Sequence, residues 1–141
     1  MSASVYAQFF RSGAIEGVGS LSKRDDDGNP YFVAAEFTNK VVLAVRQYLG
    51  VLDAFDAGFP VYAFLSLCDV SQCYYRHSPD GAGWSDTGPL KREILALPEV
   101  FIDGFNGDVP TLIRPVFNML WNAFGLQRCE MYDGQGQWRG K

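Results

Sequence analysis

Residue types that carry catalysis or bind metals are scarce in this chain. Among its 141 residues there are three cysteines and a single histidine, His77. Any dyad in which a histidine activates a cysteine or serine must therefore use His77. The cysteines are odd in number, and residues 1–20 lack the basic start and continuous apolar stretch of a secretion signal. We therefore expect reduced thiols and a cytoplasmic location, without a disulfide framework.

Long apolar runs and long basic runs are also missing. No apolar run approaches the roughly 20 residues that span a membrane as a helix, so we expect no membrane association. The chain has 12 Lys and Arg against 16 Asp and Glu, which gives a net charge of −4. Because phosphate neutralisation supplies most non-specific affinity for nucleic acids, this charge argues against a nucleic-acid partner. The basic pairs Lys23–Arg24 and Lys91–Arg92 are too short to form a polybasic arm.

Apolar and aromatic side chains, by contrast, are plentiful. Hydrophobic residues make up 48% of the chain and aromatic residues 15%. This supply argues against a disordered chain. A chain of this length can bury a core without disulfides or a metal ion, so we expect a single domain over residues 1–141.

A first helix is predicted over about residues 38–57, with an earlier start near Tyr31 as the alternative. Its apolar residues recur at intervals of four, three, four and three positions, which places them on one face: Val41, Val45, Tyr48, Leu52 and Phe55. Thr38 or Asn39 could cap its start. Gly58 and Pro60 are typical of the residues that follow the end of a helix.

A second helix is predicted over about residues 109–124. Asp108 suits the N-cap position and Pro110 suits the first turn. Pro115 does not suit a helix interior and predicts a kink or a restart near Arg114. The stretch "RPVFNMLWNAFG" has helical spacing, and its large apolar residues are Phe117, Leu120, Trp121 and Phe124. We expect this stripe to be core, and the alternative is an exposed aromatic groove that holds a partner.

Strands are expected on either side of these helices. The stretch "SVYAQFFRSGAIEGVGSL" predicts two short strands around a turn, and "EVFID" predicts another strand. The stretch "CEMYDGQGQWRG" predicts a hairpin with its turn at Asp133–Gly134. The stretch "PVYAFLSLC" predicts a central strand, both of whose apolar faces are covered, with "CYYRH" as its hairpin partner. Residues 77–92 then form a long polar loop. This order favours an α+β fold, a mainly antiparallel sheet packed by two helices.

The cysteines and the histidine do not form a familiar metal motif. Cys68, Cys73 and His77 have the spacing C-x4-C-x3-H, and Cys129 lies elsewhere. Thiolates and an imidazole could hold zinc, but this spacing is not that of a standard knuckle or finger. We therefore expect structural thiols, with no metal and no other cofactor. A hydrolase built on Cys73 and His77 is a minor alternative. The stretch "DDDGNPYFVAAE" partly follows a calcium loop, but Pro30 stands where glycine is needed, so we expect a solvated loop.

Four stretches carry a resemblance to a known group of proteins. They are, in order, "FFRSGAIEGV", "PVYAFLSLCDV", "LPEVFIDGF" and "LIRPVFNMLWNAFGLQRCEMYDGQGQW". They resemble the C-terminal accessory module of bacterial Schlafen-like proteins of the AlbA type, a group described as DNA-binding or ATP-binding. The resemblance covers about residues 8–139. It implies a defence, regulatory or mobile-element setting. It also implies that the AlbA-type domain has no counterpart here, and it assigns no catalytic residue.

Two functions follow as hypotheses. The first is a non-enzymatic module that binds a protein partner or self-associates. Its candidate surface is the 77–92 loop, with Trp84 as an aromatic anchor and Arg92 and His77 beside it, because Trp and Arg are enriched at interface hot spots. The alternative for Trp84 is a side chain folded back on its own domain. The second hypothesis is a small-molecule or nucleotide sensor with an aromatic-lined pocket. The residues expected to line that pocket are Tyr62, Phe64, Tyr74, Tyr75 and Trp121.

Overall fold

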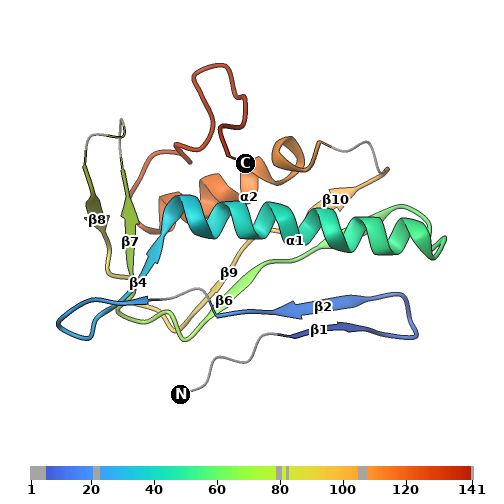
Figure 1. Cartoon of the computed structure of the whole chain (residues 1–141), viewed down its shortest axis with the longest axis horizontal. Helices are drawn as coiled ribbons and strands as arrows, with labels where there is room; N and C mark the ends of the chain where they lie inside the picture. The colour runs from blue at the N-terminus through green and yellow to red at the C-terminus, as the bar shows by residue number, and fades with distance from the viewer. Residues whose placement is uncertain (1–5, 21–22, 79–80, 82, 105–107, 141) are drawn as a thin grey trace.

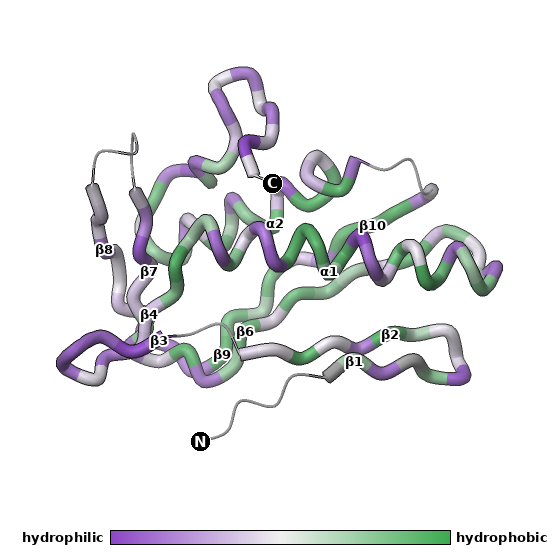
Figure 2. Tube along the Cα trace, in the orientation of Figure 1, coloured by the Kyte–Doolittle hydropathy of each residue, from purple (hydrophilic) through white to green (hydrophobic). Residues whose placement is uncertain are grey.

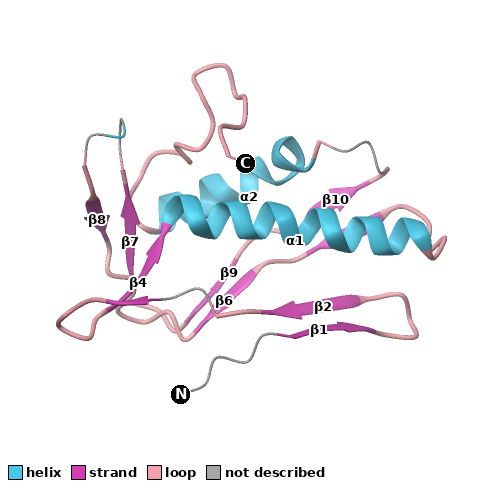
Figure 3. Ribbon diagram, viewed as in Figure 1, coloured by secondary structure: helices cyan, strands magenta, loops and turns pink. Residues whose placement is uncertain are grey.

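The computed structural model describes residues 6–20, 23–78, 81, 83–104 and 108–140. Within these residues the chain forms two helices, α1 (Ala34–Ala54) and α2 (Val109–Ala123), together with four small sheets (Figure 1, Figure 3). The predicted α+β class is confirmed. Strand pairing is mainly antiparallel, but the strands are divided among several sheets and do not form one continuous sheet. In the described part of the chain, neither helix is long and apolar enough to cross a membrane.

The first two strands form the predicted hairpin. β1 (Tyr6–Phe9) pairs antiparallel with β2 (Ile15–Val18), and the turn between them includes Gly13 with a φ of +88°. The strand was predicted to include Val5, which lies outside the described residues. A Cβ atom on Gly17 would collide with the side chain of Tyr48 on α1, so the hairpin approaches α1 closely at this glycine.

Four strands form the largest sheet, in the order β3 (Lys23–Arg24), β4 (Pro30–Val33), β7 (Tyr74–His77) and β8 (Ser85–Thr87). The turn between β3 and β4 is held by Asp25, whose Oδ1 accepts hydrogen bonds from the backbone N–H groups of Asp27 and Asn29 at 3.0 and 2.8 Å. The residues of the turn are mostly exposed, and Figure 2 shows it as a hydrophilic segment.

The position of β7 corrects two predictions. Its neighbours are β4, which is parallel to it, and β8, so "CYYRH" is not the hairpin partner of residues 61–68. The parallel pairing joins segments far apart in the sequence, and no local pattern signals it. β8 lies inside the segment 77–92, which was predicted to be a long loop; residues 79, 80 and 82 of that segment lie outside the described residues.

Helix α1 begins four residues before the predicted start. β4 runs directly into it, and Val33 at the N-cap position provides no side-chain hydrogen bond. Thr38 is not a cap: its buried hydroxyl donates to the carbonyl of Ala34, at 2.9 Å, inside the helix. The helix ends at Ala54, and Phe55, the last member of the predicted apolar face, is 69% exposed. The helix was placed too late because its start has no capping residue to mark it.

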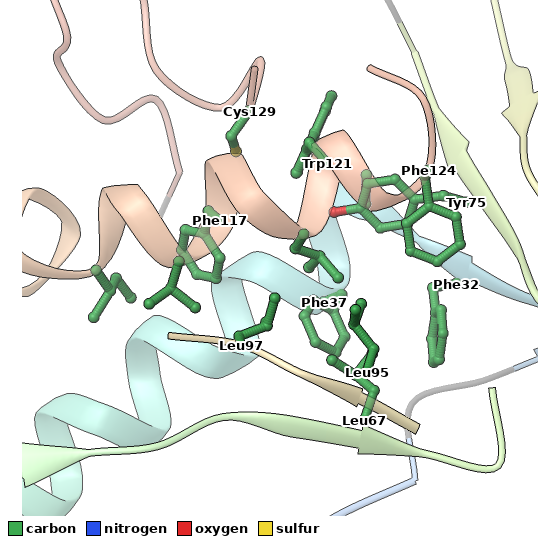
Figure 4. Close-up of a cluster of buried hydrophobic side chains, with 14 of the residues drawn as sticks. Phe32, Phe37, Leu67, Tyr75, Leu95, Leu97, Phe117, Trp121, Phe124 and Cys129 are labelled. Carbon is green, nitrogen blue, oxygen red and sulfur yellow. The ribbon is translucent and has the colours of Figure 1, made fainter. Parts of the chain in front are cut away.

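Helix α2 follows the prediction closely. Asp108 is its N-cap and accepts a hydrogen bond from the backbone N–H of Thr111 at 3.4 Å. The helix continues through Pro115 without the predicted restart, and Pro115 lies on its exposed side. The stripe in "RPVFNMLWNAFG" is core as expected, since Phe117, Trp121 and Phe124 are 0%, 1% and 3% exposed (Figure 4).

The remaining strands form a long two-stranded β-ribbon, which consists of β5 (Val61–Ala63), β6 (Ser66–Cys68), β9 (Ile94–Ala96) and β10 (Val100–Ile102). β5 pairs with β10 and β6 with β9, both antiparallel. Between these pairings, residues 64 and 65 face residues 97–99, so the second strand has one extra residue there. Such a bulge bends a strand, and it divides the single strand predicted over 61–68 into two.

The chain after α2 lies across both helices. The hydroxyl of Tyr132 donates to the carbonyl of Pro110 at 2.5 Å, and the ring of Trp138 stacks on Phe117 at a centroid distance of 6.0 Å. The predicted turn is present, with the N–H of Asp133 bonded to the carbonyl of Gln137 at 2.8 Å. The flanking pairing is limited to one bridge, between Tyr132 and Trp138. We call residues 126–140 the C-terminal segment.

Candidate functional site

His77 does not belong to an exposed loop, which corrects the predicted partner-binding surface. It is the last residue of β7, and it shares the inward face of that strand with Tyr75, two residues earlier. It is 5% exposed, and its ring meets Trp121 edge to face at 5.8 Å. Its Nδ1 lies 3.3 Å from Oε2 of Glu130 on the C-terminal segment. The imidazole therefore joins β7 to that segment and is not part of an exposed surface.

Trp84 and Arg92 are exposed, but they do not form one surface. Trp84 is 67% exposed and precedes β8 directly. Arg92 follows β8, next to Glu93, whose carbonyl accepts a hydrogen bond from the N–H of Val70. The two residues are thus at opposite ends of β8, and the predicted hot spot is divided.

The five aromatic residues predicted to line a ligand pocket do not meet around a cavity. Tyr75 is in the core, where its ring stacks on Phe124 at 4.6 Å and meets Trp121 edge to face at 5.2 Å (Figure 4). Burial raises the pKa of Tyr75 well above its usual value, because the phenolate would lose its hydration. Tyr62 and Phe64 are exposed on the far side of the β-ribbon. Tyr62 and Phe64 share the outer face of the β-ribbon, whereas Tyr75 and Trp121 come from β7 and α2 and are in the core, and sequence spacing does not show how these separate elements pack.

The cysteines offer neither a metal site nor an activated nucleophile in the described part of the chain. No group of three or more His, Cys, Asp or Glu side chains is placed to hold a metal ion there. Burial raises the pKa of Cys73 and raises that of Cys129 to about 12, so both are thiols at neutral pH. A nucleophilic cysteine needs a lowered pKa, and Cys73 has the opposite. Cys68 is exposed on the β-ribbon.

The outer face of the β-ribbon brings together several exposed large apolar side chains. Four large side chains stand on it with more than half of their surface exposed: Tyr62 at 55%, Phe64 at 72%, Ile94 at 61% and Phe101 at 53%. Tyr62 and Phe101 are cross-strand partners whose rings touch edge to face at 5.5 Å. Ser66, Cys68 and Ala96 are exposed between the two ends of the stripe.

The sequence predicts which residues share this face, but it does not predict that the face is exposed. The alternation in "PVYAFLSLC" separates an inner face of Val61, Ala63, Leu65 and Leu67 from an outer face that includes Tyr62 and Phe64. The structure shows the same separation, with Leu67 buried and Phe64 exposed. The alternation of side chains along a strand does not show whether a second layer covers the outer face. Because the outer face is apolar, it was predicted to be covered.

The edges of the β-ribbon are also open. Among the described residues, each of its strands pairs with one neighbour only, as β10 with β5 and β6 with β9. An edge strand presents backbone N–H and C=O groups that another strand can bind. The β-ribbon therefore combines an exposed apolar face with free backbone hydrogen-bonding groups.

Comparison of the chain with models of protein families, with curated proteins and with solved structures gives no match. The resemblance to Schlafen-like accessory modules therefore stays a prediction.

Proposed function

We propose that this chain is a non-enzymatic protein-interaction module that binds a protein partner, or a second copy of itself, through the outer face of the β-ribbon. The observation that supports the proposal most directly is the pair of Tyr62 and Phe101. Their rings pack against each other and yet are 55% and 53% exposed. Contiguous exposed apolar surface of this kind marks interaction sites in soluble proteins.

The energetics favour a covered state of this face. Complete burial of one large apolar side chain contributes about 1.5–3 kcal/mol. Four such residues retain more than half of their exposure, so a partner that covered them would contribute on the order of 4–7 kcal/mol before the cost of association. That amount suits the centre of an interface, around which polar residues such as Glu99 form a rim.

The biological setting of the module and the second functional hypothesis, ligand sensing, both come from the sequence. A bacterial or phage defence or regulatory role comes only from the resemblance to Schlafen-like proteins and is part of the proposal. Small-molecule or nucleotide sensing stays the second hypothesis, without the site that was predicted for it, because Tyr62 and Phe64 lie away from Tyr75 and Trp121.

Site-specific photo-crosslinking tests the proposed surface. A benzophenone amino acid replaces Phe64 in the chain produced in its native host, and the same replacement at Phe55 serves as the control. Phe55 is 69% exposed, nearly as much as Phe64, but it is the C-cap residue of α1 and belongs to no strand of the β-ribbon. We expect a discrete crosslinked species from position 64 and none of that size from position 55.

A second experiment separates self-association from a foreign partner. Light scattering after gel filtration gives the mass of the purified chain and of the double variant Tyr62→Ser/Phe101→Ser. A dimer that becomes a monomer in the variant identifies a second copy as the partner. A monomer in both cases, with no crosslink from position 64, would rule out the β-ribbon as the interaction surface.

A further inference from the structure

A second site lies away from the β-ribbon, where the C-terminal segment passes the end of β7. An open groove of about 640 Å³ is formed there, lined mostly by residues of the chain after α2 and closed by Ser78. Clefts that hold small ligands measure about 300–1,000 Å³. None of the residues that line the groove belongs to a strand of the β-ribbon. The groove is therefore separate from the surface of the proposed function.

Two guanidinium groups line this groove without a hydrogen bond or a close ion pair among the described residues, although the charge of Arg139 acts on Asp133. Arg128 and Arg139 both line the groove, and neither side chain makes a hydrogen bond or ion pair with any residue in the described part of the chain. Arg76, outside the groove, shows the contrast: its Nε and Nη2 donate to the two carboxylate oxygens of Asp86 at 2.8 and 2.9 Å. Arginine presents a planar fork of donors that matches a carboxylate or phosphate.

The two carboxylates that line the groove already have partners. Oδ1 of Asp133 accepts from the backbone N–H groups of Gln135 and Gln137 at 2.9 and 2.8 Å. These bonds hold the pKa of Asp133 below its usual value, so it stays ionised. Oε2 of Glu130 faces His77. The groove thus holds two guanidinium groups beside two acidic side chains, and the acidic pair disfavours a ligand with several negative charges.

An apolar cavity of about 110 Å³ adjoins the groove. Ser78 and Glu130 line both spaces, and the cavity is otherwise enclosed mainly by apolar side chains, namely Ala34, Ala35, Trp84, Trp121 and Met131, beside His77. A cavity of about 150 Å³ is known to hold benzene, so this smaller one suits a short aliphatic group and excludes a nucleotide base.

We propose that the groove binds the C-terminus of a peptide. Arg128 and Arg139 bind the free carboxylate, and an aliphatic side chain of the peptide, such as that of valine, enters the adjoining cavity. Ser78 and the outer oxygen of Glu130 stand at the junction, where they can pair with polar groups of the peptide backbone. The groove is larger than a single amino acid requires, which favours a chain over a free amino acid. The proposal does not rest on the function of the β-ribbon.

The binding test uses defined peptides and fluorescence polarisation. The probes are fluorescein-labelled Gly-Ser-Gly-Ser-X peptides in which X is alanine, valine or leucine with a free carboxylate, and the same peptides with an amidated C-terminus. We expect saturable binding of at least one free-acid peptide, weakened about tenfold or more by amidation. The double variant Arg128→Gln/Arg139→Gln should lose binding by a similar factor.

Matched variants separate the site from general effects. Arg11→Gln/Arg46→Gln makes the same change of charge outside the groove and should alter affinity less than about twofold. Ala35→Leu, which fills the cavity from α1, should weaken the valine and leucine peptides more than the alanine peptide. Phe64→Ser on the β-ribbon should leave peptide binding unchanged. Circular dichroism confirms that each variant is folded.

Three outcomes would overturn the proposal. The first is the absence of saturable binding of any free-acid peptide up to about 5 mM. The second is equal affinity for the amidated peptides, which would remove the role of the carboxylate. The third is stronger competition by free valine or by adenosine monophosphate than by the unlabelled peptide, which would assign the groove to a small molecule.

Discussion

Burial shifts the pKa values of individual side chains in this molecule. Cys129 is buried under α2, and its backbone N–H donates to Oδ1 of Asn118 at 2.9 Å. Burial raises the pKa of its thiol to about 12 from an ordinary value of 9.0. Burial likewise raises the pKa of Tyr132 on the same segment. These groups therefore favour the folded state only while they keep their protons.

The raised pKa of Cys129 predicts a loss of stability in alkaline solution. Below about pH 9 the thiol is protonated in both states and its contribution is complete. Between pH 9 and about 12 the unfolded chain loses this proton and the folded chain keeps it, so the free energy of unfolding falls. We expect a loss of about 1 kcal/mol from this residue between pH 8 and pH 10. Urea unfolding at the two pH values measures it.

Two variants provide the comparison. Cys129→Ala should lose less stability over this interval than the wild type, although its stability at pH 8 is lower. Cys68→Ser should follow the wild-type profile, because Cys68 is exposed. An unchanged pH dependence in Cys129→Ala would show that another group is responsible.

The sequence was a good guide at this scale where chemistry is local and a poor one where it depends on packing. The capping role of Asp108 and the turn at Asp133–Gly134 were predicted, since both follow from residue type and near neighbours. His77 was placed in a polar loop because polar residues follow it. The burial of His77 depends on Trp121 and Glu130, which come much later in the chain.

Among the elements, α2 was the most predictable. Its start has a capping aspartate and a proline in the first turn, and its apolar residues keep helical spacing through to Phe124. The start of α1 was missed because a strand, not a capped turn, leads into it. The faces of the β-ribbon were assigned correctly, but coverage of a face depends on elements elsewhere in the chain.

Neighbouring residues on α2 should respond very differently to truncation. Leu120 is 0% exposed, whereas Met119, beside it, is 50% exposed. Leu120→Ala should lower the free energy of unfolding by about 2–5 kcal/mol, because it removes buried methyl groups and leaves a cavity. Met119→Ala should lower it by less than about 1 kcal/mol. Urea denaturation with circular dichroism measures both, and equal effects would contradict the assignment of the buried face.

For the whole molecule, the C-terminal segment is the element that closes the core. It covers Phe117 with the ring of Trp138, bonds Tyr132 to the first turn of α2, and reaches His77 through Glu130. No local pattern in the sequence indicated these contacts, because each joins residues well apart in the chain. The same is true of the parallel pairing of β4 with β7.

Removal of the C-terminal segment should therefore destabilise the whole fold. A chain ending at residue 126 exposes Phe117 and the neighbouring apolar surface of α2, and we expect a lower Tm and increased binding of an apolar dye such as ANS. As a milder comparison, Tyr132→Phe removes only the hydroxyl that bonds to Pro110 and should cost about 1 kcal/mol. A truncated chain with the Tm of the full chain would show that the segment is only an appendage.

The path of the C-terminal segment also sets an order of events on the ribosome. Synthesis of β4, α1 and α2 precedes that of Glu130, Tyr132 and Trp138. The hydrophobic core is therefore complete only after the C-terminal segment has been synthesised. Domains generally fold as units during synthesis, and incompletely closed chains expose apolar surface. Until the C-terminal segment has packed back, the apolar face of α2 around Phe117 is uncovered, so the closing of the core is the last step of its assembly.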